Sequence, residues 1–319
     1  MNINKQLVLL IASFVLVVTT LVGCGESDID GQKERELEDA RIAARNQPVL
    51  GAGSAINGEA ENQESGVGVE ADLLDLSQYT LMFGDEFHGT ELDSTKWNTA
   101  LPWGSDLVIN SELQYYVDIA NKPDFGYSPF SFDGETLTIT AIETPENLRA
   151  SANEQGWLSG VLTTAGKLEV TYGYIETRVD LPPGRGLWPA FWMLSSEFID
   201  LKPQLFVMEY NGGRANSVFH NYNYQDEDNN LRSPGQWEVV EEGLSEGFHT
   251  VGVAWSPEEL LFYVDGKPRY KITGENVSRQ SMYLILNLAV GGVWTGAPDA
   301  TTRIPASYVI DYVRVYEKN

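Results

Sequence analysis

One carboxyl group stands out among the residues whose type and spacing could do chemistry. Residues 203–209 read Pro-Gln-Leu-Phe-Val-Met-Glu, and Glu209 is the only acidic residue in this strand-like segment. Phe206 adds an apolar ring beside the carboxyl group, and desolvation favours the protonated form of a glutamate. A protonated Glu209 is suited to donate a hydrogen bond or a proton.

The spacing of Gln204 and Glu209 makes a demand on the backbone. Alternate residues of a regular strand point to the same face, so two residues an odd number apart point to opposite faces. The side chains of Gln204 and Glu209 can share a face only if the strand contains a bulge. We expect this bulge around Val207 and Met208.

Two further segments, together with this one, resemble a known family. Residues 186–194 read Gly-Leu-Trp-Pro-Ala-Phe-Trp-Met-Leu, and residues 287–292 read Asn-Leu-Ala-Val-Gly-Gly. With residues 203–209 they resemble glycoside hydrolase family 16, the β-glucanase and laminarinase group, whose strand at this point reads Pro-Glu-x-Asp-x-Met-Glu. The resemblance runs from about Tyr79 to Tyr316.

The resemblance assigns a role to each position of the motif. It places the nucleophile on Gln204, the carboxylate that tunes it on Phe206, and the acid/base on Glu209. A retaining glycosidase needs two carboxyl groups about 5 to 5.5 Å apart, one of which attacks the sugar. An amide oxygen is a poor nucleophile, so the sequence predicts a protein that binds β-glucan without cleaving it.

Other segments that match sugar-contacting parts of the family are present. They contribute Asn110, Arg178, Trp188, Trp192, His220, Asn287 and Trp294. The pair Trp188 and Trp192 falls on one face of a strand, where indole rings form good platforms for sugar rings. The alternative is that these tryptophans belong to the hydrophobic core. The resemblance favours a place in the cleft.

Two other functions stay open. The first is an active endo-β-1,3-glucanase in which Glu197, Asp200 or Glu176 replaces the missing carboxylate. In an inverting enzyme, that base would lie roughly 6.5 to 9.5 Å from the carboxyl group of the acid, here Glu209. The second is an adhesin or scaffold that uses another surface. Glu176 is more simply explained as a structural partner of Arg178.

The hydrophobic pattern predicts an all-β domain. Apolar residues alternate with period two in residues 137–142, 168–181, 217–224, 249–255, 260–264, 282–290 and 308–316. Asp265-Gly266 predicts a hairpin turn, and in residues 282–290 we expect Tyr283, Ile285 and Asn287 on one face and the leucines on the other. Such strands predict two packed sheets, and the resemblance specifies a concanavalin-like β-jelly-roll sandwich with a concave glycan cleft.

The first residues have the pattern of a bacterial lipoprotein signal. A basic start and an apolar run end in Leu-Val-Gly-Cys, and Cys24 is the only cysteine of the chain. The apolar run is short for a span of about 20 residues, so we expect residues 1–24 to form a signal and lipobox. Lipidation of Cys24 would anchor the protein in the cell envelope, most simply in the outer membrane. A signal anchor with a free thiol is the alternative.

The next segment predicts a tether. Residues 25–78 are rich in acidic and small residues and hold too few apolar ones to form a core, whereas residues 79–319 are long enough for one β domain. The formal net charge of −25 argues against binding of nucleic acid, which requires a basic stripe.

The resemblance also suggests a structural calcium ion, although no cofactor is needed for chemistry. The matching positions are the carboxylate of Asp311 and backbone carbonyls near Glu86 and Gly134. Oxygen ligands of this kind suit calcium. Asp311 could instead bond a neighbouring amide, so both interpretations stay open.

Overall fold

A computed structural model of the chain describes residues 73–195, 203–241 and 243–319. The predicted signal (residues 1–24) with Cys24, most of the predicted tether, and the two loop carboxylates Glu197 and Asp200 lie outside these residues. All the described residues fall in the unit Ala40–Asn319. Within them, no helix has the length and apolar composition needed to cross a membrane.

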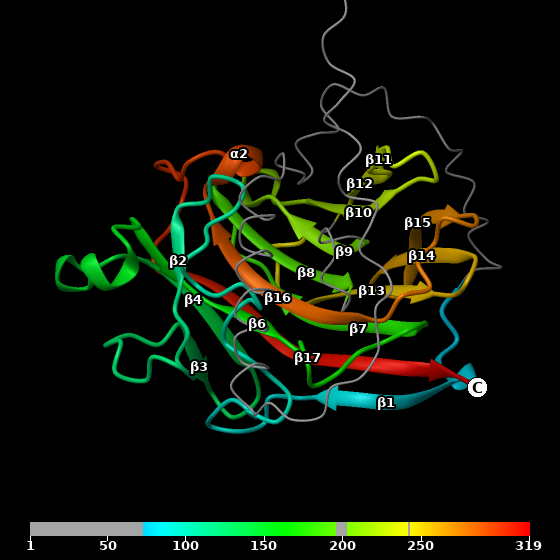
Figure 1. Cartoon of the computed structure of the whole chain (residues 1–319), viewed down its shortest axis with the longest axis horizontal. Helices are drawn as coiled ribbons and strands as arrows, with labels where there is room; N and C mark the ends of the chain where they lie inside the picture. Colours follow the sequence, from blue (N-terminus) through cyan, green and yellow to red (C-terminus); the bar gives the residue numbers. More distant parts are fainter. Residues whose placement is uncertain (1–72, 196–202, 242) are drawn as a thin grey trace, which may run out of the picture. The chain divides into compact units, whose positions relative to one another are not determined.

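The described strands form two sheets, as predicted for an all-β sandwich (Figure 1). The ten-stranded sheet contains β1 (Tyr79–Asp85), β2 (Gln114–Tyr116), β3 (Phe130–Phe132), β4 (Leu137–Glu143), β5 (Trp157–Ser159), β7 (Gly173–Asp180), β13 (His249–Trp255), β14 (Glu259–Val264), β15 (Lys267–Thr273) and β17 (Ala306–Lys318). The seven-stranded sheet contains β6 (Val161–Thr163), β8 (Leu187–Ser195), β9 (Gln204–Tyr210), β10 (Ser217–Gln225), β11 (Leu231–Arg232), β12 (Gly235–Val239) and β16 (Met282–Val290).

Helices are short in the described residues. They are four 3-10 turns and one helical turn: η2 (Leu76–Gln78), η3 (Glu146–Leu148), η4 (Ala150–Ala152), η5 (Gly212–Arg214) and α2 (Gly292–Thr295). Strand β1 begins at Tyr79, and η2 lies within the last residues of the predicted tether.

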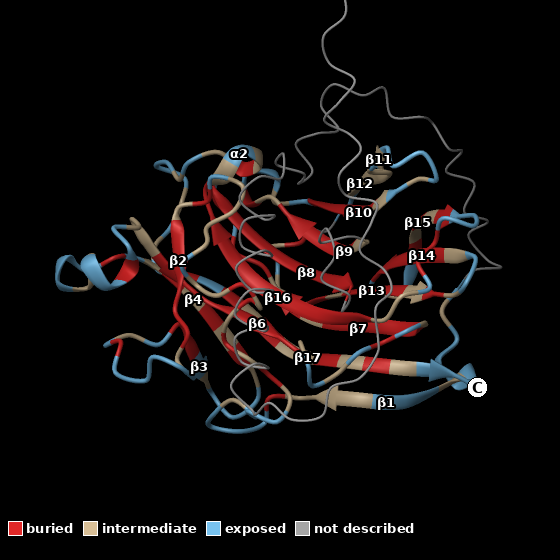
Figure 2. Cartoon of the chain, viewed as in Figure 1, coloured by how far each residue is buried: buried red, intermediate tan, exposed pale blue. Residues whose placement is uncertain are grey.

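The core lies between the two sheets, where the central strands are buried (Figure 2). Strand β16 follows the predicted alternation: Leu284, Leu286 and Leu288 join the core between the sheets. Tyr283 and Ile285 join a second apolar cluster on the other face of the same sheet. We call this second face, turned away from the ten-stranded sheet, the site face.

Most predicted strands have the expected bounds, with one clear difference. Strand β7 begins at Gly173 and not at residue 168, because Tyr172 has a φ of 71° and interrupts the extended backbone. The predicted hairpin joins β14 to β15, and its residues Asp265 and Gly266 have φ values of 51° and 69°. Two successive positive φ values are those of a type I′ turn.

Candidate functional site

The predicted bulge is present in β9 and brings the motif onto one face. Opposite β8, Met208 pairs with Phe191 but Phe206 pairs with Trp192, so Val207 is the extra residue. Val207 and Met208 both turn into the core between the sheets. The bulge therefore places the side chains of Gln204, Phe206 and Glu209 together on the site face.

His220 holds this bulge from the core, and its predicted place in the cleft is wrong. It lies on β10 opposite the bulge, and its ring packs against Phe262 of the ten-stranded sheet, with centroids 4.9 Å apart. Nδ1 of His220 lies 2.6 Å from the carbonyl oxygen of Val207. Burial lowers the pKa of His220 to about 4, so the neutral ring donates from Nδ1 to this carbonyl.

Glu209 is a buried carboxyl group whose own hydrogen-bonding groups are unused. Its side chain is 0% exposed, and neither Oε1 nor Oε2 has a partner among the described residues. Desolvation raises the pKa of Glu209 to about 8; the indole of Trp188 opposes this rise and the charge of Glu112 adds to it. Glu209 is thus protonated at neutral pH, as the sequence predicts.

Gln204 is held by a group of neutral amides on β10. Its Oε1 accepts a 3.0 Å hydrogen bond from Nδ2 of Asn223. Oδ1 of Asn223 accepts in turn from Asn221 and from Ser233, at 3.2 and 2.6 Å. The position assigned to the nucleophile therefore contains an amide held by other neutral groups.

Phe206 and Trp192 form a stacked pair, with ring centroids 5.3 Å apart and planes 9° apart. The indole of Trp192 donates to Oδ1 of Asn287 at 2.8 Å, and Nδ2 of Asn287 donates to the hydroxyl of Tyr116 at 3.0 Å. Asn287 thus lies on the site face, as predicted, but both ends of its amide bind protein groups. Its main effect is to orient Trp192.

A second buried carboxyl group, Glu112, lies beside the site. Its oxygens accept hydrogen bonds from Asn110 at 3.0 Å and from Gln114 at 2.6 Å. A Cβ atom at Gly292 would lie 3.4 Å from both Cγ of Glu112 and the ring of Trp188, so these two side chains meet at Gly292. Desolvation raises the pKa of Glu112 to about 7.

Aromatic rings gather on the site face next to Glu209. Trp294 of α2 lies 4.9 Å from Trp188 and 6.2 Å from Phe219, measured between ring centroids. Its ring is also stacked on Trp237 of β12, with centroids 5.4 Å apart and planes 15° apart. The guanidinium of Arg214 lies 4.7 Å from the Trp237 ring centroid.

Two residues predicted to be near the cleft lie on the other sheet. Arg178 and Glu176 belong to β7 of the ten-stranded sheet, which does not contain β9. Arg178 pairs with Asp311 at 2.5 Å and covers the ring of Phe248. Glu176 accepts from the hydroxyls of Tyr174 and Tyr316, so it is neither a partner of Arg178 nor near Glu209. Strand β7 belongs to the ten-stranded sheet, whereas the next strand, β8, belongs to the sheet that contains β9. The predicted places of Arg178 in the cleft and of Glu176 as a replacement carboxylate are therefore both wrong.

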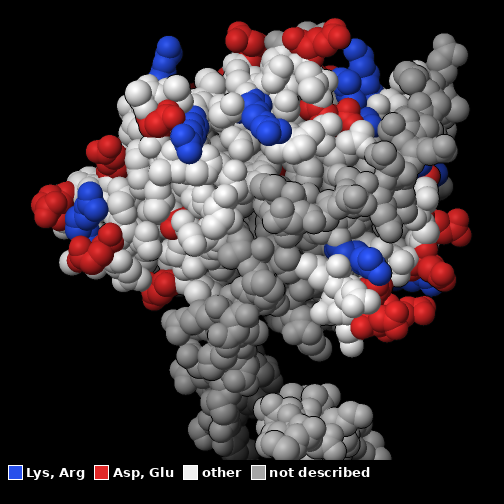
Figure 3. All heavy atoms as spheres, turned by 90° about the horizontal axis from the view of Figure 1, so that it is seen from above, with Lys and Arg blue, Asp and Glu red and all other residues white. Residues whose placement is uncertain are grey.

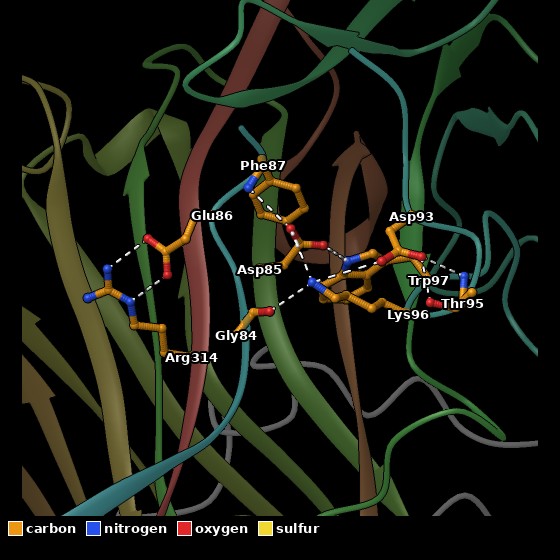
Figure 4. Close-up of polar contacts among 9 residues, drawn as sticks. All are labelled: Gly84, Asp85, Glu86, Phe87, Asp93, Thr95, Lys96, Trp97 and Arg314. Atoms are coloured by element: carbon orange, nitrogen blue, oxygen red, sulfur yellow. Dashed lines mark hydrogen bonds and ion pairs between the residues drawn. The ribbon is translucent and has the colours of Figure 1, made fainter. Parts of the chain in front are cut away.

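Of the predicted calcium ligands, the one side chain, Asp311, is already engaged with an arginine, whereas the predicted ligands near Glu86 and Gly134 are backbone carbonyls. Asp311 binds Arg178 on the neighbouring strand. Figure 4 shows the carboxylate of Glu86 facing Arg314, which donates to it at 2.8 and 2.7 Å. Gly134 lies in the turn between β3 and β4. Among the described residues, no group of three or more acidic, histidine or cysteine side chains could hold a metal. These residues do not fit a calcium ion held by the Asp311 side chain.

Several site-face residues were missed by sequence reasoning. They are Glu112, Gln114, Tyr116, Phe219, Asn221, Asn223 and Trp237. The alternation of β10 places Phe219, Asn221 and Asn223 on the face opposite His220, so the period-two pattern could have found these three. Glu112 and Trp237 lie in segments without a comparable pattern.

Charge on the described surface is mixed. In the view of Figure 3, basic side chains are scattered singly among acidic and uncharged ones.

Comparison with known proteins points to one family. The family described as "Glycosyl hydrolases family 16" matches residues 126–314. Among curated proteins, the chain is 33% identical over 250 residues to "Endo-1,3-1,4-beta-glycanase ExsH" of Rhizobium meliloti (strain 1021), which covers 76% of the chain and 53% of that relative. It is 30% identical over 286 residues to "Glucan endo-1,3-beta-glucosidase A1" of Niallia circulans, covering 81% of the chain and 41% of that protein. The chain thus spans about half or less of the length of these relatives.

Solved structures match over most of their own length. The endo-beta-1,3-glucanase of Pyrococcus furiosus is 31% identical with a TM-score of 0.62, covering 75% of this chain and 94% of that one. The laminarinase catalytic domain of Thermotoga maritima MSB8 is 29% identical with a TM-score of 0.64, covering 76% of this chain and 99% of that one. These matches support the jelly-roll sandwich.

Proposed function

Because the chain belongs to glycosyl hydrolase family 16, we propose that it binds a laminarin-like β-glucan on the site face without cleaving it by double displacement. One observation carries this proposal: of the three motif side chains that β9 presents on that face, only Glu209 is a carboxyl group. Double displacement needs a second carboxylate to form the covalent intermediate.

The electrostatics of the site support binding more than turnover. Gln204 carries no charge, and its oxygen already accepts from Asn223. Protonated Glu209 carries an O–H group that no described side chain accepts; it is buried beside the Trp188 indole, and in the bound complex we expect it to donate to a hydroxyl or glycosidic oxygen of the ligand. General acid catalysis alone contributes only about 10² to 10⁴ in rate, far below the acceleration typical of enzymes.

The choice of β-glucan rests on the names of the relatives. The two curated relatives are named as an endo-1,3-1,4-beta-glycanase and a glucan endo-1,3-beta-glucosidase, and the two structures as an endo-beta-1,3-glucanase and a laminarinase. The aromatic and amide side chains of the site face are of the kind that contact neutral sugars. A neutral polymer is also compatible with the net charge of −25.

Isothermal calorimetry of the purified protein with laminarin tests this function, with an assay for new reducing ends on the same sample. We expect a saturating isotherm and no reducing ends. Sustained heat with new reducing ends would contradict loss of turnover, and the absence of any heat would contradict glucan binding. A Trp188→Ala variant with unchanged affinity would instead favour an adhesin or scaffold that uses another surface.

An active endo-β-1,3-glucanase is the second candidate, and Glu112 is the observation that favours it. Its side chain lies next to Trp188 at Gly292, and its charge raises the pKa of Glu209. A second carboxyl group this close could act as the base of an inverting hydrolase. If reducing ends form, Glu112→Gln should abolish them while laminarin binding persists.

We also propose that the protein is a lipoprotein of the cell envelope, held in the outer membrane through Cys24. The basic start, the apolar run and the Leu-Val-Gly-Cys sequence support this proposal. Mass spectrometry of the membrane fraction should find acyl chains on Cys24. A Cys24→Ala variant that still sediments with membranes would contradict the anchor.

A further inference from the structure

Residues that pair across β9, β10 and β12 form one row on the site face. Glu209 of β9 pairs with Phe219 of β10, and Phe219 pairs with Trp237 of β12. Residues directly opposite each other on neighbouring strands point to the same face. Since neighbouring strands lie about 4.8 Å apart, this row places Trp237 about 10 Å from Glu209. Among the described strands β12 pairs only with β10, so Trp237 lies at the edge of the seven-stranded sheet (Figure 1).

Exposure to solvent changes along this row. Glu209 is 0% exposed, whereas every residue of β12 is at least partly exposed. Trp237 and Val239 are alternate residues of β12 and share the site face, and Val239 is 56% exposed. Val293, the neighbour of Trp294 on α2, is 55% exposed. On this side of Glu209, exposed apolar surface is therefore found over β12 and α2.

Arg214 adds a cation to this exposed surface. Its guanidinium lies 4.7 Å from the ring centroid of Trp237, and the same ring is stacked on Trp294. A guanidinium that lies on an aromatic ring keeps the N–H groups of its planar edge available for hydrogen bonds. Four other arginines pair with carboxylates, whereas the exposed Arg214 has no ion pair with any residue that the structure describes. Its N–H groups are therefore available to a ligand.

The backbone that carries Arg214 is held in place. Arg214 belongs to η5, the turn that joins β9 to β10, and its N–H donates to the carbonyl of Asn211 at 2.7 Å. The side chain of Asn211 accepts from the N–H of Gly213 at 3.0 Å. The carbonyl of Gly212 accepts from the N–H of Gly184 at 2.8 Å, so η5 is also bonded to the segment before β8. A group fixed before binding loses less conformational entropy when a ligand arrives.

From this arrangement we propose that Arg214 and Trp237 form a subsite for a glucosyl residue at the edge of the seven-stranded sheet. The guanidinium donates to hydroxyl groups of the sugar, while the partly exposed ring of Trp237 and the exposed Val239 contact its C–H groups. The subsite lies two strands from Glu209, so contact here does not depend on access to that buried carboxyl group. This inference rests on the proposed function, because it identifies the part of the site face that contacts the β-glucan.

Calorimetry of the purified protein with laminarin tests the subsite through an Arg214→Ala variant. Arg214 is exposed, so the variant should fold like the wild type. We expect its laminarin affinity to fall about tenfold, as for the loss of one hydrogen bond to a charged group. Unchanged affinity in this variant would overturn the subsite and leave β-glucan binding intact. Failure of the wild type to bind laminarin would overturn the proposed function itself, so the two failures are distinguishable.

Arg178→Ala is the matched control. The guanidinium of Arg178 makes the same kind of contact with the ring of Phe248, at 4.6 Å, but on the ten-stranded sheet. This variant should bind laminarin as the wild type does, and an equal loss of affinity in both variants would overturn the subsite.

Arg214→Lys separates the hydrogen bonds from the charge. Lysine retains the positive charge but lacks the planar set of N–H donors, so this variant should recover only part of the affinity that Arg214→Ala loses. A lysine variant that binds carboxymethylated laminarin more tightly than laminarin, as the wild type then also would, would show that the cation takes an anionic group and would overturn the assignment to a neutral sugar.

Discussion

The amide oxygen of Gln204 accepts a 3.0 Å hydrogen bond from Nδ2 of Asn223, on the strand next to it. A carboxylate oxygen could accept the same hydrogen bond without any change in Asn223. The site is therefore already arranged to hold a glutamate at position 204. What it lacks at that position is the charge, not the geometry.

We expect Gln204→Glu combined with Phe206→Asp to hydrolyse laminarin. The double variant restores a nucleophile that faces Glu209 across the bulge, and the aspartate removes the apolar ring that stacks on Trp192. Removing a nucleophile from an enzyme can lower the rate by about 10⁶, so a gain on the order of 10³ or more over the wild type is reasonable. Reducing-end formation on laminarin measures this gain.

Adding Glu209→Gln to the double variant is the control. Hydrolysis by double displacement also requires the acid/base, so the triple variant should lose the restored activity. Activity that survives in the triple variant would show that another group supplies the proton and would contradict the role of Glu209.

The burial of Glu209 predicts a stability that depends on pH. Its pKa is raised from 4.5 to about 8 in the folded protein. Between these values the folded state retains a proton that the unfolded state has released, so the free energy of unfolding falls as pH rises from about 4.5 to about 8. Glu112 contributes in the same direction up to about pH 7.

Glu209→Gln removes this dependence at one position. The unfolding free energy of the variant minus that of the wild type should therefore be larger at about pH 8 than at about pH 5. Urea denaturation at these two pH values measures the difference. A difference in unfolding free energy that is the same at both would contradict the raised pKa of Glu209.

The bulge illustrates what the sequence could predict about the site. The odd spacing between Gln204 and Glu209 required an extra residue, and the structure has it at Val207. The faces of β16 followed from simple alternation in the same way. Such predictions succeed because they depend on the local geometry of one strand.

Predictions that depend on which sheet a strand joins were the ones that failed. Glu176 and Arg178 are two residues apart on β7 and so share a face, but β7 belongs to the ten-stranded sheet. His220 failed for a different reason: it lies on β10, beside β9, but its side chain points into the core and not onto the site face. The stack of Trp237 on Trp294 joins β12 to α2 and has no local signal in the sequence.

Asn287 should act on Trp192 and not directly on a sugar. In Asn287→Ala, the indole of Trp192 and the hydroxyl of Tyr116 both lose a partner. A buried polar group left without a partner costs about 1–3 kcal/mol, so we expect lower stability together with weaker laminarin binding. Urea denaturation and calorimetry of the same variant measure both effects.

The milder variant Asn287→Asp separates the two roles. Its carboxylate can still accept from the Trp192 indole, so it should retain most of the glucan affinity. If Asn287→Asp weakens laminarin binding as much as Asn287→Ala does while remaining as stable as the wild type, Asn287 contacts sugar directly, which would contradict a positioning role.

His220 should stabilise the fold through the bulge. In His220→Leu, the carbonyl of Val207 loses the ring Nδ1–H that it binds at 2.6 Å, and we expect a loss of about 1–3 kcal/mol in unfolding free energy. The pKa of His220 is lowered from 6.5 to about 4 in the folded protein. The unfolded chain therefore takes up a proton first, and the wild type loses stability as pH falls from about 6.5 to about 4.

The leucine variant lacks this titration, so the stability gap between wild type and variant should narrow over the same pH range. Asn221→Leu is the control, because Asn221 is the next residue of β10, lies on the site face and does not titrate. Urea denaturation at about pH 6.5 and about pH 4.5 measures both variants. A gap that stays constant for His220→Leu, or narrows equally for Asn221→Leu, would show that the buried ring is not the source of the dependence.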